Sequence, residues 1–148
     1  MKKSLFRLND ILELGILYFI CFSSNLVFDY IESISFESYV LKVFLKNILA
    51  YRVMLSLFLT IIVVVYHYQF IHKTKKEIYC RILVGDTLSN VVTRYILNCL
   101  EILVFTYCLS IIMDIYLNLK MSNNIYLFIV FCIYILFSAS KVREYESF

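Results

Sequence analysis

Four runs of mostly apolar residues recur along this chain of 148 residues, and they constrain its fold more than any other feature. They cover about residues 11–29, 53–71, 96–117 and 123–140. A helix needs roughly 20 apolar residues to cross the hydrocarbon core of a bilayer. Lipid cannot satisfy exposed backbone N–H and C=O groups, and the strict alternation of a membrane strand is absent. We therefore predict an all-α membrane protein with four transmembrane helices.

The composition agrees with a membrane environment. Hydrophobic residues make up 62% of the chain, the mean hydropathy is +0.83, and there is no proline. A soluble domain is usually about half apolar, and one of this size leaves about a third of its chain surface in water. The net charge of +3 is modest, whereas a nucleic-acid-binding protein shows a concentrated basic face. This argues against nucleic acid as a partner and favours membrane lipids.

Basic residues predict the orientation. With four spans, the N-terminus, segment 72–95 and the C-terminus share one side of the membrane. That side carries ten of the fourteen Lys and Arg residues, and the other side carries Lys42, Lys46, Arg52 and Lys120. The positive-inside rule then predicts a multi-pass protein of the cell membrane, with both termini in the cytoplasm.

The outer segment, residues 30–52, is too short for a folded domain. It contains no proline or glycine, and its apolar residues follow helical spacing into the second span. We expect one long helix from about Phe36 to about Ile71, roughly 50 Å in length and longer than the hydrocarbon core of about 30 Å. Whether residues 31–52 stand up as a stalk or lie flat in the interface stays open.

The inner segment, residues 72–95, reads HKTKKEIYCRILVGDTLSNVVTRY. Glu77 and Arg81 are placed for an i,i+4 ion pair on a helix. Gly85 then interrupts the pattern as a helix end does, and Asp86 or Thr87 is suited to cap the next helix. We predict two short helices joined by a glycine elbow, lying along the inner face of the membrane.

This segment resembles the cytoplasmic loop of FtsX/MacB-type ABC transporter permeases. The pattern E-I-x-x-R-x-x-x-G, preceded by a basic residue, is carried here by Lys75 or Lys76, Glu77, Ile78, Arg81 and Gly85. The resemblance covers about residues 70–110, and elsewhere it is one of topology only. The chain departs from the family pattern in lacking a large outer domain. It also departs in having Asp86 after the glycine, and Asn98 where a glutamate is common, with Glu101 about one turn later.

The resemblance implies a permease subunit, not an enzyme and without a cofactor. The chain has no G-x-x-x-x-G-K-[ST] loop, so a separate cytoplasmic ATPase subunit would dock on the inner loop. The implied contact residues are Lys75, Lys76, Glu77, Ile78, Arg81, Gly85 and Asp86. Such permeases act in pairs and move their long outer helices as levers, which is called mechanotransmission. We expect a homodimer or a heterodimer with a second permease, serving export of, or immunity to, an antimicrobial peptide or a lipophilic compound.

Other functions stay open at this point. A basic loop between two spans also follows from the positive-inside rule alone. A stand-alone membrane immunity or regulatory protein would bind a toxin or a sensor without an ATPase. A small channel is less favoured because no span shows a polar stripe, and an enzyme is least favoured because no catalytic cluster is visible.

Ionisable groups inside spans are candidate functional residues because burying them in lipid is costly. Arg94, Asn98 and Glu101 fall on one face of the third span near its inner boundary. Glu101 is expected to pair with Arg94 or to reach the interface, or else to contact a partner or substrate. Asp29 and Asp114 are expected to reach the outer headgroups.

The histidines and cysteines do not suggest a metal site. None of the five cysteines has zinc-ligand spacing with another cysteine or with His67 or His72. Four of the cysteines lie in apolar runs, where they serve as small hydrophobic residues. His67, near the inner end of the second span, is expected to be a hydrogen-bonded interfacial residue, with a proton relay as the alternative.

Overall fold

The chain folds into five α-helices in a computed structural model, which describes residues 7–35, 37–120 and 122–144. The helices are α1 (Leu8–Ser33), α2 (Tyr39–Ala50), α3 (Arg52–Leu83), α4 (Leu88–Tyr116) and α5 (Ser122–Arg143). Four helices are long and apolar enough to cross a membrane, with α2 and α3 counted as one. The predicted all-α class and the number of spanning helices are confirmed.

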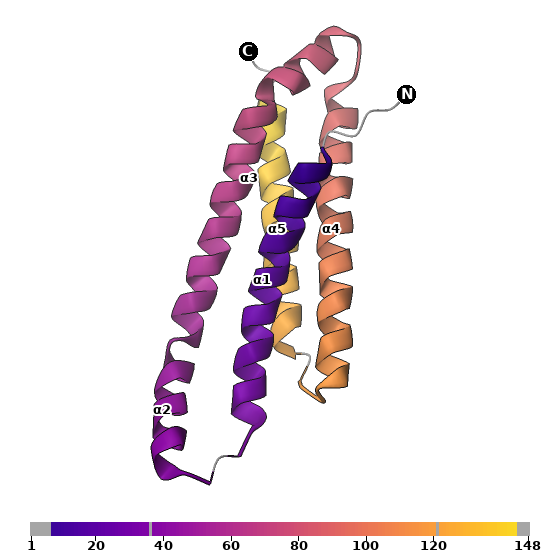
Figure 1. Cartoon of the computed structure of the whole chain (residues 1–148). Coiled ribbons are helices and arrows are strands. Elements are labelled where there is room, and N and C mark those ends of the chain that lie inside the picture. Colours follow the sequence, from indigo (N-terminus) through magenta and orange to yellow (C-terminus); the bar gives the residue numbers. More distant parts are fainter. Residues whose placement is uncertain (1–6, 36, 121, 145–148) are drawn as a thin grey trace.

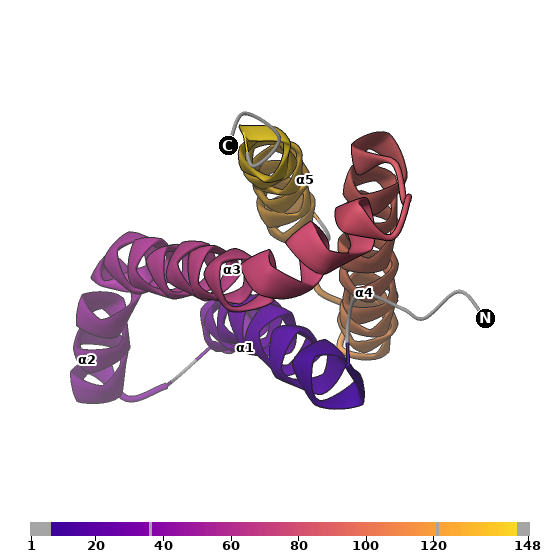
Figure 2. The same cartoon turned by 90° about the horizontal axis from the view of Figure 1, so that it is seen from above.

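The four long helices lie side by side in one bundle (Figures 1 and 2). Helix α1 contacts α3, α4 and α5, and α4 also packs along α5. The start of α1, the end of α5 and the α3–α4 turn lie at one end of the bundle, which we call the elbow end. The α4–α5 turn and α2 lie toward the opposite end. The elbow end is the side for which the sequence predicts a cytoplasmic location.

The outside of the bundle is apolar, and much of its interior is polar or aromatic. Large apolar side chains such as Phe58, Phe105 and Ile133 are about 60% exposed. The buried residues include polar and charged side chains from all four long helices: Asp10, Asn25, Asp29, His67, Thr74, Thr106, Ser110, Asp114, Asn124 and Ser138. Lipid is as apolar as leucine, so a membrane bundle gains specificity from packing and interhelical hydrogen bonds.

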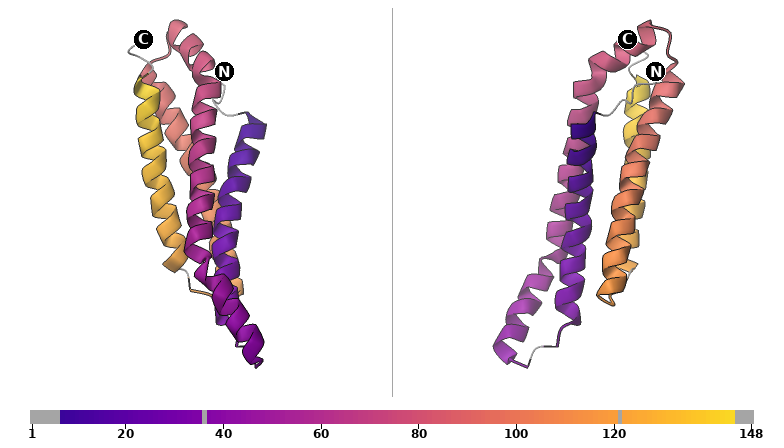
Figure 3. Two further views of the ribbon diagram at one scale, coloured as in Figure 1. Left: turned by 90° about the vertical axis from the view of Figure 1, so that its left-hand side faces the viewer. Right: turned by 45° about the vertical axis from the view of Figure 1, so that its right-hand side comes forward.

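The long second helix is present with a break at Tyr51. Tyr51 has φ −84° and ψ −1°, and α2 continues the general direction of α3 as a stalk beyond the ends of α4 and α5 (Figure 3). Together they run from Tyr39 to Leu83, which is 45 residues. Phe36, the predicted start, lies outside the described residues. The helix continues past Ile71, its predicted end, to Leu83, because no residue between them interrupts helical geometry.

Two helix ends make Schellman turns at opposite ends of the bundle. After α3, the N–H of Asp86 donates to the carbonyl of Arg81 at 3.0 Å, and Gly85 has φ +101°. After α4, the N–H of Leu119 donates to the carbonyl of Asp114 at 2.9 Å, and Asn118 has φ +53°. Glycine and asparagine are the residues that tolerate this left-handed position. The turns reverse the chain without a long loop and set α4 alongside its neighbours.

Candidate functional site

A chain of buried hydrogen bonds joins one residue from each of the four long helices. The hydroxyl of Tyr18 on α1 lies 2.8 Å from Nε2 of His67 on α3. Nδ1 of His67 lies 3.0 Å from the hydroxyl of Tyr95 on α4, which lies 3.0 Å from Oγ of Ser138 on α5. All four side chains are at most 2% exposed. We call this set the four-helix hydrogen-bond chain.

The chemistry of the imidazole fits this arrangement. A neutral imidazole accepts at one nitrogen and donates at the other, so His67 serves two tyrosine hydroxyls at once. Its ring also meets Tyr134 edge-on, at 5.5 Å between ring centroids, and Phe70 stacks on Tyr95 at 6.3 Å. The arrangement fixes α3 relative to α4, two helices that otherwise share few contacts.

The expected hydrogen bonding of His67 is confirmed, and the side chain lies in the bundle interior, 1% exposed. Its position at the membrane interface stays a prediction. Tyr18 and Ser138 were missed because they sit in apolar runs with no distinctive spacing, and Tyr95 was missed because it ends the inner segment directly before the third span. Only a histidine amid apolar residues marked the place.

The residues predicted to couple to an ATPase lie at the elbow end. Glu77 and Arg81 form the expected i,i+4 ion pair, with Arg81 Nη2 at 2.9 Å from Glu77 Oε1. Ile78 is buried against the bundle. Lys75 and Lys76 lie on the exposed side of α3. The structure therefore separates an inward-packed face from an outward-facing basic one.

The turn itself is clamped to α4. Asp86 accepts a hydrogen bond from Arg94 at 3.1 Å, and Thr87 Oγ1 accepts one from the N–H of Asn90 at 3.4 Å. Of the two predicted caps, Thr87 fills the role. The predicted pair of short helices is wrong, since residues 72–83 continue α3 and residues 88–95 begin α4. The helix continues because the Lys-rich stretch contains good helix formers.

An apolar tip projects from this elbow. Leu83 is 71% exposed and Val84 is 89% exposed, and Tyr79 is about half exposed on the same outer part of α3. Figure 1 shows the last turns of α3 leaning across the top of the bundle toward α4. Large apolar side chains at the end of a bundle, beside two lysines, are suited to contact a partner or the membrane interface.

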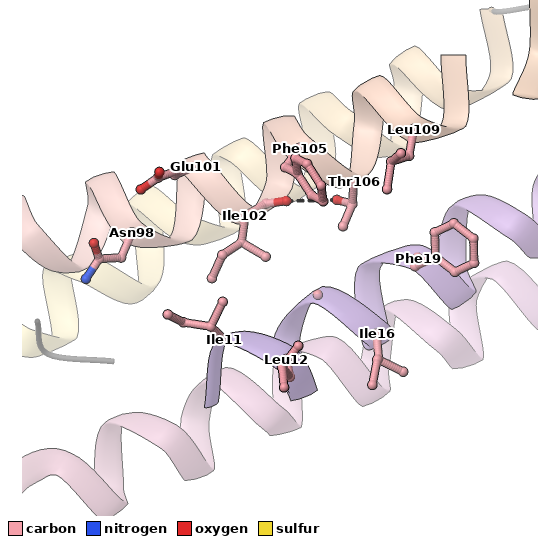
Figure 4. A pocket seen from close by; sticks show the side chains of 11 residues that line it. Ile11, Leu12, Ile16, Phe19, Asn98, Glu101, Ile102, Phe105, Thr106 and Leu109 are labelled. Carbon is pink, nitrogen blue, oxygen red and sulfur yellow. Dashed lines mark hydrogen bonds between the residues drawn. The ribbon is translucent and has the colours of Figure 1, made fainter. Parts of the chain in front are cut away.

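A groove of about 480 Å³ runs between α1 and α4 on the outside of the bundle. Two of the predicted intramembrane polar residues, Asn98 and Glu101, line its elbow-side end (Figure 4). The remaining lining is mostly apolar, with Gly15 among the α1 residues. Arg94 does not line the groove, and it pairs with Asp86 rather than with Glu101. The expected ion pair between Glu101 and Arg94 is therefore wrong, because the guanidinium of Arg94 pairs with the carboxylate of Asp86 in the α3–α4 turn.

Two aspartates toward the other end of the bundle, Asp29 and Asp114, are buried. Asp114 is 0% exposed, and its Oδ2 accepts a hydrogen bond from Nδ2 of Asn124 at 2.8 Å. Asn124 Nδ2 also donates to Ser110 Oγ at 2.8 Å. Asp29 accepts from Arg52 Nη2 at 2.7 Å. The expectation that Asp29 and Asp114 reach the outer headgroups is wrong, because each faces partners on another helix.

Within the described residues, no group of three or more His, Cys, Asp or Glu side chains is arranged to hold a metal ion. The five cysteines are free, with Cys21 and Cys99 buried. Comparison of the chain with protein-family models, with curated proteins and with solved structures found no match.

Proposed function

We propose that this chain is the membrane subunit of an ABC-type transporter, driven by a separate cytoplasmic ATPase that docks on the α3–α4 elbow. The observation that carries the proposal is the build of the elbow. It combines an exposed apolar tip at Leu83 and Val84 with a base that is locked to the bundle by the Asp86–Arg94 pair. The resemblance of residues 75–86 to the coupling loop of FtsX/MacB-type permeases supports the same interpretation.

The elbow is connected to the bundle so that force on it reaches two helices together. Ile78 on α3 and Val91 on α4 are both buried beneath it. Further from the elbow, His67, about three turns from Ile78 on α3, bonds to Tyr95, about one turn from Val91 on α4, at 3.0 Å. Displacement of the tip therefore moves α3 and α4 as one unit rather than bending either alone.

The lever in this proposal is the α2–α3 helix. Its 45 residues would extend about 68 Å if straight, which is about twice the hydrocarbon thickness. None of the side chains of α2 is buried in the bundle. Its exposed apolar residues, including Val40 and Phe44, are available to a second permease, either another copy or a different chain. The cargo in this proposal is a peptide or a lipophilic compound.

The test is an affinity purification from native membranes in mild detergent, followed by mass spectrometry. The expected result is a stoichiometric P-loop ATPase. Val84→Asp should abolish its recovery, because a carboxylate cannot enter an apolar docking site without losing its hydration. Lys46→Glu on α2, at the opposite end of the bundle, is the matched control and should leave recovery unchanged.

A double variant separates the effect on ATPase docking from an effect on folding. The exchange Glu77→Arg with Arg81→Glu keeps an i,i+4 ion pair while reversing the charge pattern presented to a partner. The protein should stay folded, and the ATPase should bind more weakly. Recovery of the wild-type chain without any ATPase would contradict the proposal. Recovery with only a small peptide would favour a stand-alone immunity or regulatory protein.

A further inference from the structure

The α1–α4 groove has one polar end and one apolar end. Its polar end is formed by Asn98 and Glu101, close to Ile11 near the start of α1 (Figure 4). Its other end is formed by Phe19 and Leu109. From Ile11 to Phe19 is about 12 Å along α1, which compares with about 15 Å for half a hydrocarbon core. In a membrane, the polar end lies near the headgroups and the apolar end lies among the acyl chains.

Glu101 differs from every other acidic side chain in the five helices. Each of the six others has a hydrogen bond or an ion pair with another residue. These pairs are Asp10–Lys73, Glu13–Tyr66, Asp29–Arg52, Glu32–Arg52, Glu77–Arg81 and Asp114–Asn124. Glu101 makes no hydrogen bond or ion pair with any residue that the structure describes. A carboxylate at the edge of hydrocarbon is costly to keep without a partner. The polar end of the groove therefore favours a positively charged group.

We propose that this groove binds a single-chain amphiphile with a protonated amine head, held by Glu101, and an apolar tail lying toward Phe19. The volume of about 480 Å³ lies in the range of small-molecule sites, about 300 to 1,000 Å³. Gly15 contributes no side chain, which leaves room between the helices for the tail.

The inference deepens the proposed function by naming the chemical class of the transported compound, and in that respect it rests on that function. Binding in the groove does not require an ATPase, however, because Glu101 is remote in sequence from the elbow tip at Val84. The two proposals therefore have separate tests. A negative result for ATPase docking does not contradict binding of an amphiphile in the groove, and the reverse also holds.

The test uses the full chain in an uncharged maltoside detergent, with a decylamine analogue that carries a photoreactive diazirine at the end of its tail. Cross-links should map to Phe19, Phe105 and Leu109. Unlabelled decylamine should displace the probe at a concentration about tenfold or more below that of decanol, because a hydrogen bond to a charged group exceeds one between neutral groups. Equal displacement by the two compounds would overturn the proposal.

Variants at Glu101 test the charge. Glu101→Gln should remove the preference for decylamine over decanol, and Glu101→Lys should reverse it in favour of decanoate. Glu13→Gln is the control, because Glu13 faces α3 and accepts a hydrogen bond from Tyr66 at 3.1 Å. Glu101 is on the outside of the bundle, so neither variant disturbs buried packing. An unchanged preference in Glu101→Gln would refute the assignment.

Two other occupants are outcomes of the same experiment. Displacement of the probe by phosphatidylethanolamine at a lower concentration than decylamine would assign the groove to a two-chain lipid and overturn the proposal. Cross-links to a second copy of the chain would show that a subunit contact covers the groove, which would also overturn it. Amine-specific labelling of the groove in a chain that co-purifies with no ATPase would support the binding site and contradict the transporter proposal.

Discussion

Replacing Tyr95 by Phe tests the four-helix hydrogen-bond chain most directly. The change removes a single oxygen and keeps the ring that stacks on Phe70. It removes the hydrogen bonds of the hydroxyl to His67 at 3.0 Å and to Ser138 at 3.0 Å, together with its contact with the thiol of Cys99. Ring packing is preserved, so the measured effect reports the hydroxyl contacts.

The magnitude follows from the number of bonds lost. Interhelical hydrogen bonds in membrane proteins contribute about 0.6 kcal/mol on average and about 1.7 kcal/mol at most. Two such bonds give a loss of about 1 to 3 kcal/mol in the free energy of unfolding. Tyr18→Phe, which removes only the bond to His67 at 2.8 Å, should cost about half as much.

The assay is the unfolding free energy measured by steric trapping in bicelles. Tyr107→Phe is the matched control, because Tyr107 is on the same helix and its hydroxyl bonds to no described residue, while its ring packs on Phe128 at 4.6 Å. The control should change stability by less than about 0.5 kcal/mol. Equal losses in Tyr95→Phe and Tyr107→Phe would refute the argument that hydrogen bonds, rather than packing, join the four helices.

Three further predictions concern the turn, the ion pair at the α2 end and the orientation. Gly85→Ala should lower the unfolding free energy by about 1 to 2 kcal/mol, because φ is +101° at this position. Gly15→Ala should not lower it, because the new Cβ would lie 3.7 Å from Ile102, an ordinary van der Waals distance. Steric trapping measures both variants. Arg52→Ala should cost about 3 to 5 kcal/mol by leaving the buried carboxylate of Asp29 without its guanidinium, and replacing both residues by apolar ones should recover most of the loss in the same assay. A single cysteine at position 76 in a cysteine-free background should react with an impermeant maleimide only after the cells are permeabilised. Labelling in intact cells would reverse the predicted orientation.

Local chemistry determined the elements of the fold. The length and apolarity of the four runs impose helices because backbone groups in lipid have no other partners. The elbow was also predictable, because Gly85 marks a helix end and the i,i+4 spacing of Glu77 and Arg81 follows from helical geometry. Asn98 and Glu101 were identified as intramembrane polar residues because charges and amides are rare in such runs. Each of these features depends only on neighbours in the sequence.

The tertiary structure decided which side chains meet. Tyr18, His67, Tyr95 and Ser138 come from four separate helices, and their hydrogen bonds depend on how each helix is rotated about its axis. Apolar runs facing lipid on one side and protein on the other show little contrast between their faces, so the sequence does not specify that rotation. For the same reason, the burial of Asp114 and the choice of Asp86 over Glu101 as the partner of Arg94 were visible only once the helices were packed.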